Sequence, residues 1–253
     1  MGPMSEPAFF TQDFDGECLS GAYSAGTTAT AVLLHGAGKG SKERLLPLLG
    51  EFTAQGCGAI AFDFSGHGES TGDLAELSLR RRFEQAVAVV DAQVPAGHPL
   101  ILVGFSMSGQ TVADLAAHYG DRVAALGLCA PAVYAAEAWD VPFGQGDGRF
   151  SALIRRPEGW RDSAALAALR AYEGRAVLVV PGTDHVIPPA VTEAVQDALS
   201  TRARFSRLDL PDADHFLGMW LRDHAEDRRE LVTSLLTGLT EGGCAATRAG
   251  VAK

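Results

Sequence analysis

The sequence predicts an α/β fold with a mostly parallel, twisted sheet, helices on both faces and antiparallel strands at its N-terminal edge. Apolar, β-branched runs alternate with segments of helical periodicity, and this alternation is typical of parallel strands joined by helical crossovers. Two strand-like segments that flank Asp15-Gly16 precede the alternation, and this dipeptide favours a hairpin turn. The 253 residues suffice for one domain that buries about three quarters of its unfolded surface.

Each expected element follows from a particular run of the sequence. The strands are short apolar runs bounded by Gly, Pro or polar residues, and the helices carry apolar residues at spacings of three and four. In chain order the expected elements are strands 9–14 and 18–23, strand 29–34, helix 43–55, strand 58–64, helix 77–94, strand 99–105, helix 108–119, strand 123–129, strand 176–180, helix 189–199, strand 203–210 and a last helix.

The most informative stretch is Gly104-Phe105-Ser106-Met107-Ser108-Gly109, between an expected strand and an expected helix. A strand, a small-x-Ser-x-small turn and a helix hold a nucleophilic serine at the top of a sheet. Small residues on both sides of Ser106 permit the tight turn, whose strain exposes the hydroxyl. The common pattern is G-x-S-x-G, and here Ser108 stands at the fifth position, where serine is still small enough. The alternative for Ser106 is an ordinary helix-capping serine.

A serine hydroxyl needs a base to activate it, and the base needs an acid to orient it. Asp184 follows the apolar run 176–180, and His215 follows the alternating segment 203–210. Both therefore lie just past the carboxyl end of an expected strand, as Ser106 does. We assign Asp184 as the orienting acid and His215 as the base.

Other residues compete for these two roles. His185 adjoins the chosen aspartate and points elsewhere if that aspartate faces the site, and His224 lies within the last helical pattern. Asp212 and Asp214 lie too close in sequence to the chosen histidine for the usual arrangement.

The expected oxyanion hole lies after the apolar run 29–34, in His35-Gly36-Ala37-Gly38. Glycine there lets the backbone approach a substrate closely. The backbone N–H groups of Ala37 and Met107 are the two donors that we assign. Each is worth roughly 3 to 4 kcal/mol to a transition state when its geometry is right.

Together these motifs resemble the α/β-hydrolase superfamily, in the branch of small bacterial serine hydrolases related to esterases and to the serine-aminopeptidase-like group. The residues that carry the resemblance span about 30 to 216 in the right order, and they are His35-Gly36-Ala37-Gly38, the segment Phe62 to Ser70, the Ser106 elbow, Gly182-Thr183-Asp184 with Ile187-Pro188, and Asp214-His215-Phe216. The order serine, aspartate, histidine is the chain order of the triad in this fold. The resemblance implies the α/β-hydrolase fold and the triad, and it says little about the substrate.

The expected chemistry is hydrolysis of a carboxylic ester of a small to medium, partly apolar substrate through an acyl-enzyme. Ester cleavage is favoured over amide cleavage because an alkoxide leaves more easily than an amine. Thioester hydrolysis, lactone opening, amide or peptide cleavage and acyl transfer stay open on the same residues. A non-catalytic small-ligand sensor is the alternative of another class.

The segment Pro131 to Tyr172 is longer than an ordinary connection between strands. In the family that the chain resembles, such an insertion forms a short cap over the active site. The aromatic residues that we expect to bind the apolar part of a substrate are Trp139, Phe143, Phe150 and Trp160. The alternative is that they only anchor the cap to the body.

The domain organisation expected is a single domain over residues 1–253, with the cap insertion at about 131–172 and disordered ends at 1–7 and 241–253. The net charge of −10 argues against nucleic-acid and anionic-membrane partners, so the expected partner is a small molecule. The basic run Arg80-Arg81-Arg82 is expected on the solvated face of a helix.

Cofactors and metals are not expected. The four cysteines make no metal or redox spacing, and no cluster of histidines and carboxylates has the spacing of metal ligands. The glycine-rich segment 36–41 fits neither pattern of a nucleotide-binding loop. Free thiols, the lack of a secretory pattern and the lack of a membrane-spanning stretch favour a cytoplasmic protein.

Overall fold

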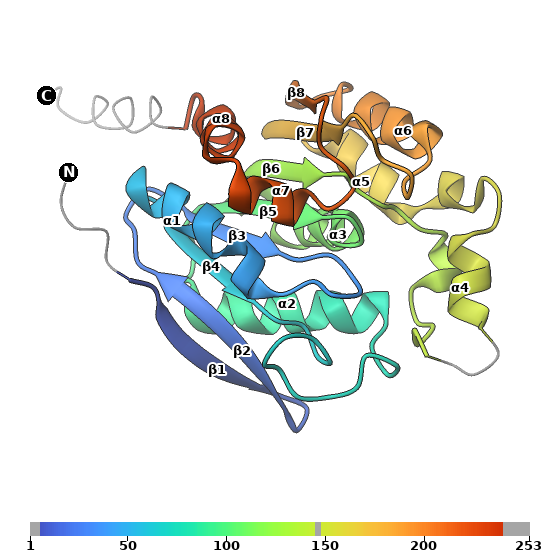
Figure 1. The fold of residues 1–253 in the computed structure, drawn as a ribbon, viewed down its shortest axis with the longest axis horizontal. Helices are drawn as coiled ribbons and strands as arrows, with labels where there is room; N and C mark the ends of the chain where they lie inside the picture. The colour runs from blue at the N-terminus through green and yellow to red at the C-terminus, as the bar shows by residue number, and fades with distance from the viewer. Residues whose placement is uncertain (1–5, 145–147, 240–253) are drawn as a thin grey trace, which may run out of the picture.

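The computed structural model describes residues 6–144 and 148–239. Its strands form one eight-stranded sheet in the order β1-β2-β4-β3-β5-β6-β7-β8 (Figure 1). The strands are β1 (Ala8–Phe14), β2 (Glu17–Ser24), β3 (Thr30–Leu34), β4 (Gly58–Phe62), β5 (Leu100–Phe105), β6 (Val123–Cys129), β7 (Arg175–Pro181) and β8 (Arg204–Leu210). Strand β2 is antiparallel to both β1 and β4, and all other pairs are parallel. The expected fold class is therefore confirmed.

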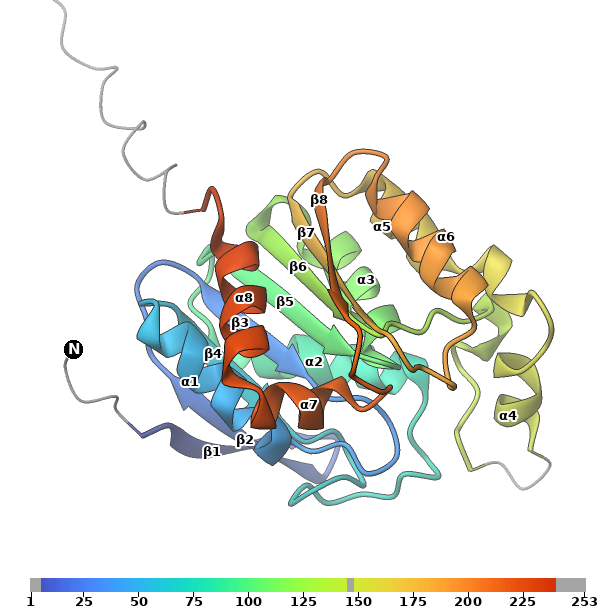
Figure 2. The ribbon, with the colours of Figure 1, turned by 45° about the horizontal axis from the view of Figure 1, so that its top comes forward.

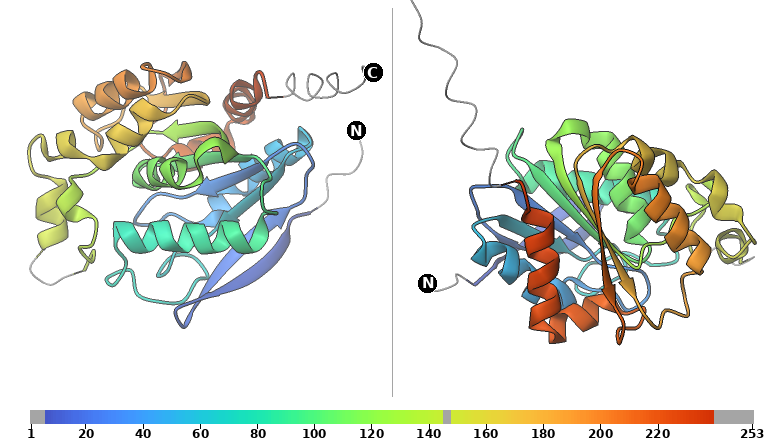
Figure 3. Two further views of the ribbon diagram at one scale, coloured as in Figure 1. Left: turned by 180° about the vertical axis from the view of Figure 1, so that it is seen from behind. Right: turned by 90° about the horizontal axis from the view of Figure 1, so that it is seen from above.

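Helices cover both faces of the sheet (Figures 2 and 3). The α-helices are α1 (Leu46–Ala54), α2 (Leu79–Gln93), α3 (Ser108–Tyr119), α4 (Arg149–Ile154), α5 (Ala164–Ala171), α6 (Pro189–Leu199), α7 (Leu217–Asp223) and α8 (Ala225–Leu236). The short 3-10 helices are η1 (Lys42–Leu45), η2 (Gly120–Arg122), η3 (Ala136–Ala138) and η4 (Gly159–Asp162). Helices α2, α3, α5 and α6 pack on one face, and α1 and α8 pack on the other with α7 beside both.

The central strands are buried on both faces, which explains their nearly continuous apolar sequences. Along β3, Val32 and Leu34 face the core that α2 and α3 cover, whereas Ala31 and Leu33 face the core that α1 and α8 cover. This alternation is the period of two of an extended chain. The carboxyl ends of the parallel strands share one edge of the sheet, where functional loops of open α/β sheets gather.

The hairpin at the N-terminal edge forms where the sequence predicts it. Asp15 and Gly16 have φ of 49° and 81°, and Phe14 pairs with Glu17 across the turn. Two consecutive residues with positive φ suit a two-residue turn between right-twisted strands.

The segment between β6 and β7 divides into two parts. Its first part carries the short helices η3, α4 and η4, and α4 lies away from the sheet (Figure 1). Its last part, α5, packs on α3 and α6, and Ala165, Leu166 and Leu169 join the main core. Of the expected disordered ends, 1–5 and 241–253 lie outside the described residues, and Glu6 and Pro7 belong to no helix or strand.

Within the described ranges, the structure contains no helix with the length and apolar character needed to cross a bilayer.

Candidate active site

Ser106 lies in a strained turn between β5 and α3. Its φ is 52°, in the left-handed region that residues other than glycine seldom adopt. The Ser106 N–H donates to the carbonyl of Cys129 at 2.9 Å, and the Ser106 carbonyl accepts from the N–H groups of Gly109 at 2.8 Å and Ala132 at 2.9 Å. A backbone conformation of this kind costs about 1 to 3 kcal/mol, and it persists because the surrounding hydrogen bonds hold Ser106 in it.

Small residues around Ser106 are needed for steric reasons. A Cβ atom on Gly104 would lie 2.5 Å from the carbonyl oxygen of Ser108, and one on Gly109 would lie 2.6 Å from Cβ of Pro131. Ser108, which replaces the usual glycine of the pattern, donates from Oγ to the carbonyl oxygen of His35 at 2.6 Å. The turn therefore tolerates serine at this position and uses its hydroxyl.

His215 connects Ser106 to Asp184 through both of its ring nitrogens. His215 Nδ1 lies 2.9 Å from Asp184 Oδ2, and His215 Nε2 lies 2.9 Å from Ser106 Oγ. Because an ionised carboxylate only accepts hydrogen bonds, Nδ1–H is the donor to Asp184. Nε2 is then the acceptor for the Ser106 hydroxyl. These three side chains thus form one hydrogen-bonded chain, as their positions after β5, β7 and β8 predict.

The carboxylate of Asp184 is held by the backbone that follows it. Its Oδ1 accepts from the N–H groups of Val186 at 2.7 Å and Ile187 at 3.0 Å, which leaves Oδ2 directed to His215. The Thr183 N–H donates to the carbonyl of Ala213 at 3.0 Å, so the loop of the aspartate is fixed to the loop of the histidine.

The competing residues lie elsewhere. His185 is exposed, and the carboxylate of Asp214 accepts from the N–H of Phe216. His224 stacks on Trp220 and separates α7 from α8, so the expectation that it lies within a helix is wrong. His224 has an extended backbone, with φ of −111° and ψ of 93°, and this ends one helix before the next begins.

The two expected oxyanion donors belong to the residues that directly follow Gly36 and Ser106. No described residue accepts a hydrogen bond from the backbone N–H of Ala37 or Met107. Gly36 lies directly against the elbow, because a Cβ on it would be 3.2 Å from both Ser106 Cβ and the carbonyl oxygen of Phe105. Two free N–H groups beside Ser106 can hold an oxyanion.

The buried ring of His35 shapes this loop. Its Nδ1 lies 2.6 Å from the carbonyl oxygen of Gly36, and its Nε2 accepts from the N–H of Phe64 at 3.1 Å. Burial, with the charge of Arg82 as a second cause, holds the pKa of His35 well below its ordinary value. The neutral ring with Nδ1–H as donor satisfies both contacts.

Arg82 is a residue of the site that the sequence analysis missed. Its side chain is fully buried. The expectation that the run Arg80-Arg81-Arg82 lies on the solvated face of a helix is therefore wrong for Arg82. Arg82 Nη2 donates to the carbonyl of His35 at 2.7 Å and to Ser108 Oγ at 2.8 Å, and its guanidinium lies 3.7 Å from the ring centroid of Phe64. Burial lowers the pKa of Arg82 to about 9, which leaves it a cation at pH 7.

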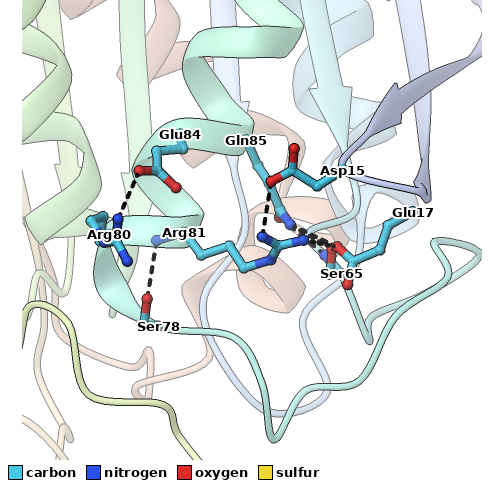
Figure 4. Close-up of polar contacts among 8 residues, drawn as sticks. All are labelled: Asp15, Glu17, Ser65, Ser78, Arg80, Arg81, Glu84 and Gln85. Carbon is cyan, nitrogen blue, oxygen red and sulfur yellow. Dashed lines mark hydrogen bonds and ion pairs between the residues drawn. The ribbon is translucent and has the colours of Figure 1, made fainter.

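Polar contacts at the start of α2 connect this helix to the N-terminal hairpin and to the loop after β4 (Figure 4). Ser78 caps the helix by accepting from the N–H of Arg81 at 3.1 Å. The Arg81 side chain pairs with Glu17 at 2.9 Å on the N-terminal hairpin, and Gln85 donates to Ser65 on the loop after β4. These contacts hold the helix that carries Arg82, whose Nη2 lies 2.7 Å from the carbonyl oxygen of His35.

Lys42 anchors the far end of the same loop. It is fully buried, and its Nζ donates to Asp63 at 2.8 Å and to Glu69 at 2.6 Å. Burial acts to lower the pKa of Lys42, but the hydrogen bonds and charges of the two carboxylates outweigh it and raise that pKa. The loop between β3 and α1 is thus fixed to the loop after β4.

The pocket at Ser106 has a volume of about 590 Å³ and is formed by three segments of the chain. They are residues 35–41, 44 and 45 after β3, residues 105–106 at the elbow, and residues 215–219, from His215 into α7. Trp139, Phe143, Phe150 and Trp160 do not line this pocket, so the structure does not bring them together with Ser106. Phe143 and Phe150 pack on each other and around Met107, and Trp160 packs on the main core.

Trp139 lines a separate cavity of about 320 Å³ together with Gln110, Asp114 and Tyr134. Gln110 donates from Nε2 to both carboxylate oxygens of Asp114, at 3.0 and 3.1 Å. Burial raises the pKa of Asp114 to about 7, with the hydrogen bonds from Gln110 acting in the opposite direction.

Asp114→Asn is expected to stabilise the protein at pH 8 and not at pH 4. The carboxyl binds its proton more tightly in the folded state, so the free energy of unfolding falls as pH rises from about 4 to 7 and stays low above. The amide removes this loss, which is on the order of 2 kcal/mol. Urea unfolding of both proteins across this pH range measures the difference between their free energies of unfolding. Titratable groups that the two proteins share contribute equally to both values and cancel in this difference. If the free energies of unfolding of the two proteins differed by the same amount at every pH, that result would contradict the expectation.

The described residues contain no group of three or more His, Cys, Asp or Glu side chains that could hold a metal ion.

Solved structures show which known folds the chain resembles. The thioesterase domain from the curacin biosynthetic pathway is 15% identical, with a TM-score of 0.71 over 90% of this chain and 100% of that domain. An esterase from Butyrivibrio proteoclasticus, solved with ferulic acid bound, is 16% identical, with a TM-score of 0.67 over 90% and 99% of the two chains. An esterase from Pyrococcus furiosus is 16% identical, with a TM-score of 0.65 over 92% of each. No curated protein matches the sequence.

Sequence comparison identifies the family. The family described as serine aminopeptidase, S33, matches residues 26–154, which are just over half of the chain and include the loop of His35 and the Ser106 elbow. The chain therefore belongs to the serine aminopeptidase S33 family of α/β hydrolases, as its motifs imply.

Proposed function

We propose that this hydrolase is a serine esterase that cleaves a carboxylic ester of a small to medium, partly apolar substrate. Ser106 is the nucleophile, His215 the general base and acid, and Asp184 the residue that orients His215. The observation that supports this most strongly is the pair of 2.9 Å contacts that link His215 to Ser106 and to Asp184. A nucleophile, a base and an orienting acid within hydrogen-bond distance define this class of site.

The reaction has two steps. In the first, His215 Nε2 takes the Ser106 proton while Oγ attacks the ester carbonyl, and it then gives this proton to the departing alkoxide. In the second, a water molecule gives a proton to His215 and attacks the acyl-enzyme, and Ser106 regains its proton as the acid leaves. Asp184 holds the tautomer of His215 and stabilises the imidazolium that forms in each step.

The N–H groups of Ala37 and Met107 stabilise the oxyanion of each tetrahedral intermediate. Both are without a protein acceptor among the described residues; Met107 directly follows Ser106, and Ala37 lines the same pocket as Ser106. Preorganised donors of this kind usually supply the largest electrostatic contribution to acyl transfer. The helix α3 begins at Ser108, so its N-terminus adds a favourable field at the same place.

The first test is covalent labelling by a fluorophosphonate probe with mass mapping of the adduct. We expect one adduct on Ser106 in the wild type and none in Ser106→Ala. Matched ester, thioester and amide substrates with one acyl chain then rank the possible reactions, and the ester is expected to be cleaved fastest. Saturable ligand binding in a folded protein that takes no probe and turns over no substrate would favour the sensor alternative.

A further inference from the structure

The part of the pocket beyond the oxyanion loop carries positive charge without a counter-charge. Lys39 and Arg44 both line the pocket, and neither forms an ion pair with a described residue. None of the residues that line this pocket, all of them described, is an aspartate or a glutamate. The charge of Arg44 extends to His35, whose pKa it helps to lower.

This charge is opposite to that of the whole protein. The chain has 31 acidic and 21 basic residues, for a net charge of −10. Two basic residues nearby have acidic partners: Lys42 binds two carboxylates, and Arg81 binds Glu17 and Asp15. A pocket lined by two cations and no carboxylate is therefore opposite in charge to the protein as a whole.

The backbone of the same loop adds donors. No described residue accepts a hydrogen bond from the backbone N–H of Gly38 or of Lys39. Gly38 has a φ of 70°, so the chain turns at this residue. Ser41 also lines this part of the pocket. Successive free N–H groups beside cationic side chains favour an anion. The glycine-rich segment 36–41 fits no nucleotide-binding pattern, but its structure suits a single anionic group.

The remaining walls of the pocket are apolar. Leu45, Phe105 and Leu217 are buried there, while Phe216 is 58% exposed and Met219 is 37% exposed at the rim. Such walls suit a hydrocarbon chain, and they leave the cationic end as the place for a charged terminus.

We propose that Lys39, Arg44 and the Gly38–Lys39 backbone form a subsite for an anionic group, a carboxylate or a phosphate, carried by the substrate. The inference rests on the proposed function, because the subsite belongs to the pocket of Ser106. The preferred substrate is then an ester with an apolar stem and an anionic end, on either its acyl part or its alcohol part.

Two matched pairs of esters test the subsite and distinguish these two arrangements. Ethyl hydrogen adipate and ethyl hexanoate share a six-carbon acyl chain and differ in a terminal carboxylate. The phosphate ester 2-(butanoyloxy)ethyl phosphate and butyl butanoate share the acyl part and differ in a phosphate on the alcohol. We expect kcat/KM to be about tenfold or more higher for the anionic member of at least one pair.

Arg44→Gln and Lys39→Gln are expected to lower kcat/KM of the anionic esters to about the value of their neutral partners. Arg170→Gln, which removes an equal charge from an exposed position on α5, is expected to keep the preference. Neutral esters cleaved as fast as anionic ones, with all variants alike, would overturn the subsite and leave the proposed esterase function intact.

Binding to Ser106→Ala provides a readout that needs no turnover. Calorimetry of this variant is expected to show tighter binding of ethyl hydrogen adipate or of the phosphate ester than of its neutral partner, and loss of that difference when Arg44→Gln is added. If the wild type cleaves none of the esters, the esterase proposal fails and this comparison alone decides the subsite. Equal affinities within both pairs would overturn it.

Discussion

Replacing Ser106 by alanine is expected to lower kcat for ester hydrolysis by about a thousandfold or more. The hydroxyl is the group that hydrogen-bonds to His215, and its loss leaves no nucleophile for an acyl-enzyme. The backbone donors of Ala37 and Met107 remain, so substrate binding and KM are expected to change little. Steady-state kinetics with purified protein measure both parameters, and thermal unfolding monitors the fold.

Ser106→Gly is the matched control for this prediction. Glycine adopts the φ of 52° at this turn without the strain that serine or alanine carries there. Both variants lack the hydroxyl, so both are expected to be equally inactive although their stabilities differ. Activity near that of the wild type in either folded variant would refute the proposed role of Ser106.

The sheet could be predicted closely because its central strands are buried on both faces. Such strands read as apolar runs with clear ends, so β6 was expected at 123–129 and is found there. The helix expected at 108–119 is likewise found at those residues. The neighbouring positions of Ser106, Asp184 and His215 follow from the same regularity, since the carboxyl ends of parallel strands meet at one edge.

The buried charges could not be predicted in this way. A charged residue in a helical pattern is normally assigned to the solvated face of the helix, and the sequence pattern places residues 80–82 there for this reason. The acceptor of Arg82 is the carbonyl of His35, 47 positions earlier in the chain, and Lys42 binds Asp63, 21 positions later. No local pattern marks such distant pairs. Ser108 at the fifth position of the elbow is a local signal, because its hydroxyl needs a hydrogen-bond partner nearby.

The walls of the pocket could not be predicted either. An aromatic-rich insertion between strands suggests a cover over the site, but Phe143 and Phe150 fill space around Met107 instead. Which segments face Ser106 depends on the path of the loops after β3 and β8, and the first of these, at residues 36–41, is rich in small residues. The interpretation that the aromatic residues anchor the insertion agrees better with these contacts.

Arg82→Met is expected to lower kcat by about tenfold to a hundredfold without loss of stability. Losing an oxyanion donor outright costs about a hundred- to a thousandfold, and Arg82 acts one step away, by holding the carbonyl of His35 two residues before Ala37. The free energy of unfolding is expected to stay within about 1 kcal/mol or to rise, because an apolar side chain replaces a buried cation without a carboxylate partner.

Arg82→Lys separates positioning from packing. Lysine keeps the cation and one donor toward the His35 carbonyl, so it is expected to recover part of the lost kcat, whereas KM is expected to stay near the wild-type value in both variants. The rate of fluorophosphonate labelling of Ser106 should fall in parallel with kcat, since that reaction also develops charge at the oxyanion hole. A residue with a purely structural role would instead change the free energy of unfolding and leave kcat of the folded fraction unaltered, and that result would refute the positioning role of Arg82.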